Sequence, residues 1–378
     1  MKIVLATGIY PPDIGGPATY ARALAEELCK RGVEVVVVTY GDIRHQTSDS
    51  SLKSHVPSLW KVIHLPKNGG PLARWLRYAK ALREHASDAD GVIAFSSVST
   101  GVPLMLARLK KPKKILRLGG DFFWERYTDR GGKKNLREFY ESPPWLYWYT
   151  SIPIRGIFWG VDVLVFSTRY QEEMYEKYFK ALPKHSVIEN AIPEGAPKLH
   201  EKHEPFRLLF LGRLVGFKNL PALVRAIGTL REAPLRRNVT LAFVGDGPMK
   251  MCLEGLVRSL KLQGWVRFLP STHDEEKKRY FADYDLLVLP SLTELSPNVV
   301  LEARAHGLPV LLSSETGLSE RLREGMTVRQ LRSEAEIVQA ILEVMTNYAK
   351  VAQTAANLPL SRSWGEVAEE FLNIMRSS

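Results

Sequence analysis

The chain has 378 residues, 45% hydrophobic and 25% charged, and its 52 Lys and Arg against 41 Asp and Glu give a formal charge of +11. This length predicts two or three domains with substantial cores, and the charge favours anionic partners: phosphorylated substrates, acidic lipid or nucleic acid. Two distant cysteines, Cys29 and Cys252, argue against a disulfide framework or a zinc site. We interpret both as core thiols and expect a cytoplasmic protein.

The amino terminus, MKIVLATGIYPP, predicts a first strand that enters a turn rather than a signal peptide. No uninterrupted apolar stretch of about 18 residues is present, which argues against a transmembrane helix. The most apolar region, 143–160, is interrupted by Pro153, Arg155 and Gly156. We expect this region either to enter a core or to lie on a surface.

Runs rich in Val, Ile and Leu recur along the chain before turn residues and helix-like stretches. Such an alternation predicts parallel sheets covered by helices on both faces. The predicted fold class is therefore α/β, with two Rossmann-like doubly wound domains that face a cleft. The predicted strands are 2–7, 33–40, 91–96, 114–118, 161–167, 206–212, 239–245, 266–270, 286–290 and 309–313.

The stretch IENAIPEGAPKLHEKHEPF separates the two series of strands and is rich in Pro, Gly and charge. We interpret residues 191–205 as a linker between a first domain at 1–190 and a second at 206–361. The last residues show apolar side chains near helical spacing. They predict a terminal helix at 362–378 that packs on the first domain.

A predicted helix at 71–86 carries basic residues interleaved with aromatic and aliphatic ones. A solvated helix face is the interpretation we favour. The alternative is peripheral contact with an anionic membrane, at the inner face, which the apolar 143–160 region and the +11 charge make plausible.

Three turns at strand ends have the chemistry of a phosphate site. Gly15 and Gly16 open a helix, although their spacing differs from the dinucleotide fingerprint. Arg213 and Lys218 lie in a loop after the strand at 206–212, where they could neutralise a diphosphate. Gly245 lies in VGDGP, a tight turn that lets backbone approach a ligand. Alanine at Arg213 or Lys218 is expected to weaken binding with little loss of folding stability.

The stretch TELSPNVVLEARAHGLP predicts a helix over 297–306, with Ser296 as its N-cap. The helix amides near Asn298 and Val299 would attract a phosphate. Glu294 precedes the helix and Glu302 lies inside it, so the two carboxylates cannot have the same role. Because a phosphate would repel both, sugar hydroxyls are their natural partners.

Two Asp-x-Asp motifs, at 88–90 and 283–285, mimic a metal site. Both precede strands and therefore belong to the amino edge of a sheet, opposite the cleft. We expect no metal and no separate cofactor.

These motifs together make the chain resemble family 4 retaining glycosyltransferases with the two-domain GT-B fold. The resemblance covers nearly the whole length, and the block at 282–311 is its most specific part because it holds two glutamates separated by seven residues. The resemblance implies a nucleotide sugar, linked to UDP, GDP or ADP, as the donor and a glycan or lipid-linked saccharide as the acceptor. It also implies polysaccharide or glycolipid assembly.

The resemblance also implies residue roles. Arg213 and Lys218 would hold the donor diphosphate, Glu302 would bind the ribose, and Glu294 would face the donor sugar. The glycines at 15 and 16 would border the phosphate. Many relatives carry a histidine after the fourth or fifth strand, and here Asp121 is the nearest polar replacement. Asp121 would accept the acceptor hydroxyl's proton or bind a hydroxyl; alternatively, it caps local backbone.

Two alternatives remain open from the sequence, one enzymatic and one not. The same fold could serve a sugar-nucleotide epimerase or a phosphorylase. The non-enzymatic alternative is a basic nucleic-acid-binding protein, but the chain shows none of the usual nucleic-acid modules, and we expect no nucleic-acid partner.

Overall fold

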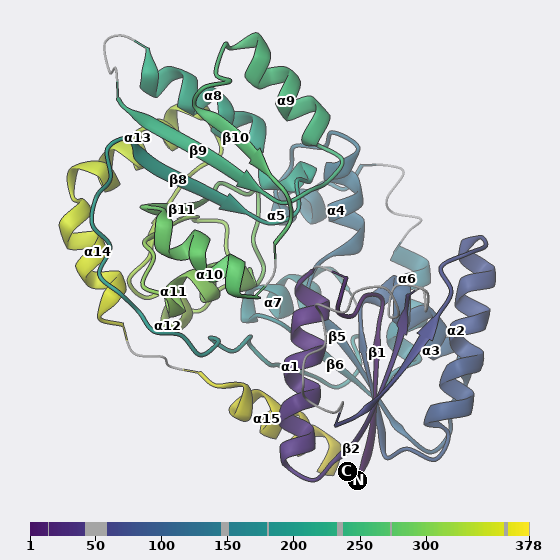
Figure 1. Cartoon of the computed structure of the whole chain (residues 1–378). Coiled ribbons are helices and arrows are strands. Elements are labelled where there is room, and N and C mark those ends of the chain that lie inside the picture. Colours follow the sequence, from purple (N-terminus) through teal and green to yellow (C-terminus); the bar gives the residue numbers. More distant parts are fainter. Residues whose placement is uncertain are drawn as a thin grey trace. The chain divides into compact units, whose positions relative to one another are not determined.

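The computed structural model describes residues 1–13, 15–41, 59–144, 151–179, 181–232, 237–272, 274–358 and 362–377, without the side chains of 151–154, 274 and 275. The chain divides into two compact units, whose elements are labelled in Figure 1. Unit 1 comprises Met1–Phe122, Pro144–Asn190 and Trp364–Ser378, and unit 2 comprises Phe123–Pro143 and Ala191–Ser363.

Unit 1 is built on a parallel sheet whose described strands follow the order β3-β2-β1-β4-β5-β6-β7. The central strands are apolar along their whole length because helices cover both faces, and residues 3–6 of β1 are fully buried. The strands are β1 (Lys2–Thr7), β2 (Glu34–Tyr40), β3 (Lys61–Leu65), β4 (Gly91–Phe95), β5 (Lys113–Leu118), β6 (Val163–Phe166) and β7 (His185–Val187).

The end of the chain packs within unit 1, against its first helix. The rings of Tyr20 and Trp364 meet edge to face at 4.8 Å between centroids, and Arg31 Nη2 donates to the Gly365 carbonyl at 3.1 Å. The helices are α1 (Gly16–Lys30), α2 (Pro71–Ala86), the π-helical turn η3 (Ser97–Gly101), α3 (Val102–Ala107), α6 (Ser151–Trp159), α7 (Arg169–Tyr178) and α15 (Trp364–Arg376).

Unit 2 contains a second parallel sheet, in which the described strands follow the order β10-β9-β8-β11-β12-β13. Alternate residues of β8 enter two different cores: Leu208 and Phe210 pack with α8 and α13, whereas Leu209 and Leu211 pack with α11. The strands are β8 (Phe206–Leu211), β9 (Val239–Val244), β10 (Val266–Leu269), β11 (Leu286–Leu289), β12 (Val310–Ser313) and β13 (Thr327–Arg329).

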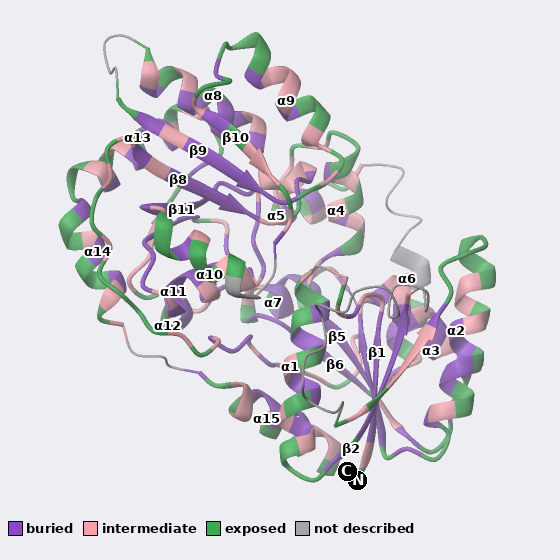
Figure 2. Ribbon diagram, in the orientation of Figure 1, coloured by how far each residue is buried: buried purple, intermediate pink, exposed green. Residues whose placement is uncertain are grey.

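The helices α8, α13 and α14 each have one buried face and one more exposed face, as their colouring in Figure 2 shows. Most of α4 and all of α5 belong to unit 2, although they precede the rest of this unit in the sequence. The helices are α4 (Phe122–Asp129), α5 (Leu136–Glu141), the 3-10 turn η5 (Gly216–Lys218), α8 (Leu220–Arg231), α9 (Lys250–Ser259), α10 (Asp274–Asp283), α11 (Asn298–Ala305), α12 (Glu320–Arg323), α13 (Glu334–Thr346) and α14 (Tyr348–Ala356).

The structure confirms an α/β fold with two parallel-sheet units, and each predicted strand is present within two residues of its expected ends. Three described strands were not predicted: β3, β7 and β13. They are short, lie toward or at the edges of their sheets, and mix polar with apolar residues, so they lack the continuous apolar run of a central strand. No helix among the described residues is long and apolar enough to cross a bilayer.

Two expectations were wrong. Residues 123–143 lie in unit 2, not in the first domain, because their contacts are with the loops after β8 and β11. Cys252 is exposed and Cys29 is partly exposed, so neither is a core thiol. Cys252 belongs to the outer face of α9, whose buried residues are Leu253 and Val257.

Candidate functional site in unit 2

The strand order of unit 2 reverses direction between β8 and β11. In open parallel sheets, ligands bind outside the carboxyl ends of the strands at this reversal, because the loops that follow the two strands diverge there. The loop 212–219 follows β8 and carries Arg213 and Lys218, while the loop 290–297 follows β11 and carries Glu294. The topology therefore brings these three predicted residues to one edge of the sheet.

A buried ion pair links the two loops. Lys218 Nζ contacts Glu294 Oε1, and the side chains are only 13% and 6% exposed. Ser291 Oγ donates to the same carboxylate oxygen at 2.5 Å, and the Leu292 amide donates to the Phe217 carbonyl at 2.8 Å. A carboxylate removed from water needs such partners, so the two loops hold each other in position.

The backbone of Glu294 is anchored as firmly as its side chain. Its amide donates to the Glu315 carbonyl at 2.8 Å, and its carbonyl accepts from the Gly317 amide at 2.7 Å. Glu294 and Thr316 form an isolated parallel bridge. Glu294 therefore lies in a loop, but its backbone is hydrogen-bonded like that of a strand residue.

Arg213 differs from Lys218 in being exposed. Among the residues that the structure describes, no side chain or backbone group makes a hydrogen bond or ion pair with its guanidinium. Its backbone is held, because its carbonyl accepts from the Val215 amide at 3.1 Å. The guanidinium can therefore bind an anion without breaking an existing contact.

Gly245 lies where two backbone segments come close together. Its φ is 143°, and a Cβ atom there would lie 2.1 Å from the Gly212 carbonyl oxygen. The Gly212 amide donates to the Val244 carbonyl at 3.0 Å. The structure thus explains this glycine through the packing of the turn after β9 on the loop after β8, and its contact with a donor stays a prediction.

The helix α11 begins one residue later than expected, at Asn298, with Pro297 as its N-cap. Ser296 was predicted as the N-cap; this was wrong, because Pro297 has extended backbone and stays outside the helix. Asn298 and Val299 are the first two residues of the helix, as predicted. Glu302 lies in its second turn, where its carboxylate contacts Lys277 Nζ of α10.

In unit 1, Gly15 is the N-cap of α1 and Gly16 is its first residue. Asp121 follows β5 and is 1% exposed, with its Oδ2 accepting from the Tyr175 hydroxyl at 2.8 Å. This hydrogen bond anchors the carboxylate within unit 1. Its predicted contact with an acceptor is not tested by this geometry.

The sequence analysis missed Arg117, which is 5% exposed at the carboxyl end of β5. Its guanidinium carbon lies 3.7 Å from the centre of the Tyr20 ring, and Nη2 donates to Asn190 Oδ1 at 2.5 Å. Within the described part of the chain it has no acidic partner. The only sequence signal was a single arginine inside the apolar run KILRL.

The two Asp-x-Asp motifs anchor strand starts. Asp90 Oδ2 accepts from the Lys2 amide at 2.7 Å, and Asp285 Oδ2 accepts from the Arg207 amide at 2.6 Å, so each holds the amino end of the first strand of its sheet. The described residues include no group of three or more side chains that could hold a metal ion.

Two doubly wound parallel sheets, with cations and carboxylates at the reversal point of the second, define the GT-B class. Solved structures share the fold over the whole chain. Sucrose-phosphate synthase from Thermosynechococcus elongatus matches with a TM-score of 0.78 and 18% identity over 99% of this chain and 98% of that one. Anabaena HepE, solved in complex with UDP and glucose, matches with a TM-score of 0.73 and 16% identity over 99% of each chain.

Sequence comparison identifies the family. A model described as "Glycosyl transferase 4-like domain" matches residues 15–191, and one described as "Glycosyl transferases group 1" matches 205–347. The chain is 30% identical to a D-inositol 3-phosphate glycosyltransferase of Nocardiopsis dassonvillei over 97% of this chain and 90% of that protein. It is 25% identical to an uncharacterised glycosyltransferase of Methanocaldococcus jannaschii over 100% of this chain and 98% of that protein. The chain belongs to the group 1, family 4 glycosyltransferases, and it is a transferase enzyme.

Proposed function

We propose that this enzyme transfers a sugar from a nucleotide-diphosphate sugar, linked to UDP, GDP or ADP, to a glycan or a lipid-linked saccharide. The observation that carries the proposal is the Lys218–Glu294 pair, which joins the loop after β8, where Arg213 also lies, to the loop that leads from β11 into α11. Two cations beside a helix amino terminus suit a diphosphate. The complex of Anabaena HepE with UDP and glucose supports the choice of ligand class.

We propose that transfer retains the donor's anomeric configuration. The exposed Arg213 guanidinium, Lys218 and the amides of Asn298 and Val299 would stabilise the leaving diphosphate as its charge develops. Glu294, held in place by Lys218 and Ser291, would face the donor sugar, and Glu302 would bind the ribose hydroxyls after exchanging its contact with Lys277. Catalysis would then depend on positioning and fixed charge, without a metal or a separate cofactor.

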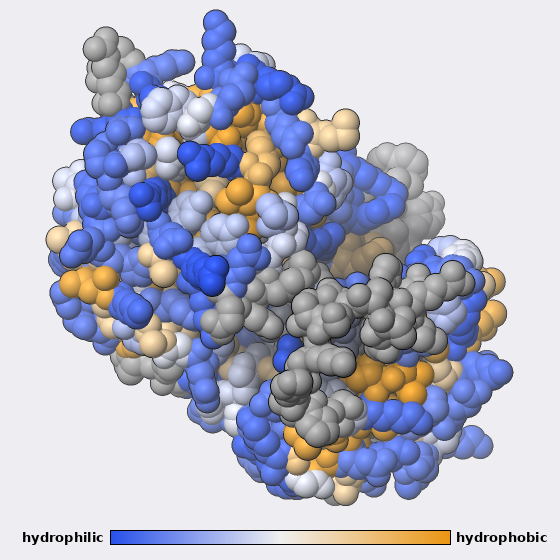
Figure 3. All heavy atoms as spheres, in the orientation of Figure 1, coloured by the Kyte–Doolittle hydropathy of each residue, from blue (hydrophilic) through white to orange (hydrophobic). Residues whose placement is uncertain are grey.

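On the acceptor side, we propose that Asp121 contacts the acceptor hydroxyl and that Gly15 and Gly16 border the donor phosphate. Lipid-linked acceptors would require the enzyme to work at the inner face of a membrane. Leu72 and Leu76 of α2 are 63% and 50% exposed, and Figure 3 shows some apolar side chains among hydrophilic ones in the region of α2. Basic Lys80 and Arg83 are exposed on the same helix, which supports peripheral contact with anionic lipid.

A thermal-shift screen with UDP, GDP and ADP tests the donor site. A nucleotide that binds the native state raises its stability by about 2.7 kcal/mol at a concentration one hundred times Kd. We expect one of the three to raise Tm in wild type and to raise it less in Arg213→Ala. No shift with any of them would contradict the proposed donor class.

Product analysis with a panel of nucleotide sugars then tests the reaction. We expect a new glycoside, formed in step with release of the nucleoside diphosphate and with the donor's anomeric configuration by NMR. Inversion would contradict the proposed stereochemistry. Family membership does not favour the epimerase or phosphorylase alternative, and those activities would give an epimerised donor or a sugar phosphate instead.

A further inference from the structure

Residues 123–143 belong to unit 2, although the chain on both sides of them belongs to unit 1. This segment, hereafter the 123–143 segment, contains most of α4 and all of α5. It begins two residues after Asp121. Its contacts reach both loops of the candidate donor site, the loop after β8 and the loop after β11.

The contact with the loop after β8 is close and partly aromatic. Trp124 is 2% exposed, and its ring lies 5.2 Å from that of Phe217. The Gly216 amide lies 3.4 Å from Asp129 Oδ1, and a Cβ atom on Gly216 would lie only 2.3 Å from the Thr128 carbonyl oxygen. The segment therefore fixes how near the loop that carries Lys218 can approach it.

The contact with the loop after β11 is a buried hydrogen bond. The amide of Leu136, the first residue of α5, donates to Thr293 Oγ1 at 3.0 Å. Thr293 is 1% exposed and immediately precedes Glu294. An amide in the first turn of a helix has no acceptor within the helix. Thr293, in the loop after β11, supplies an acceptor for the Leu136 amide.

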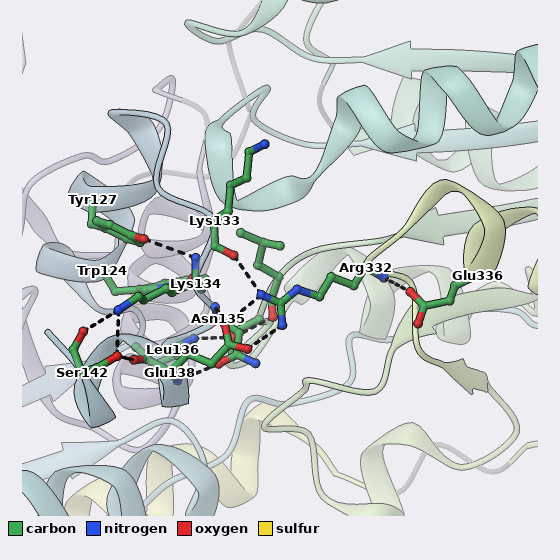
Figure 4. Close-up of polar contacts among 12 residues, drawn as sticks. Trp124, Tyr127, Lys133, Lys134, Asn135, Leu136, Glu138, Ser142, Arg332 and Glu336 are labelled. Atoms are coloured by element: carbon green, nitrogen blue, oxygen red, sulfur yellow. Dashed lines mark hydrogen bonds and ion pairs between the residues drawn. The ribbon is translucent and has the colours of Figure 1, made fainter. Parts of the chain in front are cut away.

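A third contact ties α5 to the body of unit 2. Arg332 binds the carboxylate of Glu138 in a bidentate pair, with Nη1 to Oε1 at 2.5 Å and Nη2 to Oε2 at 2.9 Å (Figure 4). Glu138 also accepts from the Asn135 amide at 3.0 Å within the capping box of α5. The pair is half exposed, so it orients α5 and contributes only modestly to overall stability.

We propose that the 123–143 segment is a positioning element of the donor site, and that Trp124, Leu136 and Glu138 hold the loops of Lys218 and Glu294 in their binding geometry. This inference rests on the proposed function, because it assumes that the two loops bind a nucleoside diphosphate. A displacement of about 1 Å at a reacting centre can lower rates by about a hundredfold, so a rigid support has a direct catalytic effect.

The test compares variants at the contact with matched variants elsewhere in unit 2. Gly216→Ala adds a methyl group toward the Thr128 carbonyl, whereas Gly255→Ala adds one in α9 where nothing lies within 4 Å. Glu138→Gln removes the charge of the Arg332 pair but keeps an acceptor for the capping box. Glu343→Gln removes the charge of a second bidentate pair, Arg329–Glu343, which joins β13 to α13 and does not involve α5.

Affinity for UDP, GDP and ADP is measured by titration calorimetry, kcat and donor KM are measured with the active donor, and Tm is measured on the same samples. We expect Gly216→Ala to weaken nucleotide binding by about tenfold and to lower kcat, and Glu138→Gln to do the same to a smaller degree. Gly255→Ala and Glu343→Gln are expected to bind as wild type. A double variant, Glu138→Gln with Arg332→Gln, should bind no worse than Glu138→Gln alone.

The outcomes separate the two proposals. If wild type binds none of the three nucleotides, the donor assignment fails. If wild type binds and Arg213→Ala weakens binding, while Gly216→Ala and Glu138→Gln bind and turn over as wild type, the positioning proposal is overturned and the donor assignment survives. If Gly216→Ala does not fold, Glu138→Gln with its Glu343→Gln control decides the question.

Discussion

The ammonium of Lys218 contacts the carboxylate of Glu294 across 76 positions of sequence, and both side chains are largely buried. This pair makes Lys218 a structural residue as well as a candidate phosphate ligand. The expectation that alanine at this position would leave folding stability intact does not fit the burial of Glu294, because the carboxylate would lose its cation.

Lys218→Met is therefore expected to lower the free energy of unfolding by about 3 kcal/mol, because it leaves the buried carboxylate without its cation and with Ser291 as its side-chain partner among the described residues. Adding Glu294→Gln should recover much of this loss, since the amide carries no charge, but it should not restore transfer. Urea unfolding measures the stability of wild type, Lys218→Met and the double variant, and a transfer assay measures the activity of each. Equal stability of Lys218→Met and wild type would show that the pair contributes nothing.

Arg213→Ala is expected to act on binding alone. Loss of a charged hydrogen bond to the diphosphate should raise the donor Kd by about tenfold to a hundredfold. Tm should stay unchanged, since the guanidinium is exposed and has no partner within the described residues. Arg258→Ala, an exposed arginine in the last turn of α9, is the matched control. A variant that binds nucleotide as wild type would remove Arg213 from the site.

The Glu138–Arg332 pair predicts a pH dependence. The hydrogen bond from Arg332 lowers the pKa of Glu138 below its ordinary value of 4.5. A lowered pKa in the folded state means that the pair stabilises the fold above pH 4.5 and that this effect is lost as the pH falls through the folded-state pKa. The stability difference between wild type and Glu138→Gln should therefore shrink below pH 4.5. A difference that is constant from pH 7 to pH 3 would contradict the assignment.

Transfer is expected to proceed without a divalent metal. In the proposed site, Arg213 and Lys218 would supply the charge that a metal would otherwise provide to the leaving diphosphate. Activity should be the same after dialysis against EDTA as before it, with magnesium or manganese added back as the comparison. Loss of activity that either metal restores would require a revised site.

Membrane contact through α2 is tested by co-sedimentation with vesicles. Wild type should bind vesicles that contain anionic phosphatidylglycerol more strongly than pure phosphatidylcholine, and Leu72→Gln with Leu76→Gln should weaken this binding. Met251→Gln, at a residue 83% exposed on α9, is the control for a general loss of surface apolarity. Equal binding by the double variant and wild type would exclude α2 as the contact.

Much of the candidate site could be predicted because its residues directly follow strands with a strong apolar signal. Arg213 and Lys218 come after β8, Glu294 comes after β11, and the carboxyl ends of parallel strands share one edge of a sheet. The partners of these side chains could not be predicted. Neither the contact between Glu302 and Lys277 nor the Asp121–Tyr175 hydrogen bond has a periodic or local signature.

The sequence by itself determined the two parallel sheets and the chemistry at their strand ends, because a buried strand needs a continuous apolar run and a turn needs particular residues. Only the tertiary structure decided that the 123–143 segment belongs to unit 2. Its hydrogen bond to the loop after β11, from Leu136 to Thr293, spans 157 positions. Contacts at that separation depend on which surfaces meet after the sheets have formed, and no local pattern encodes them.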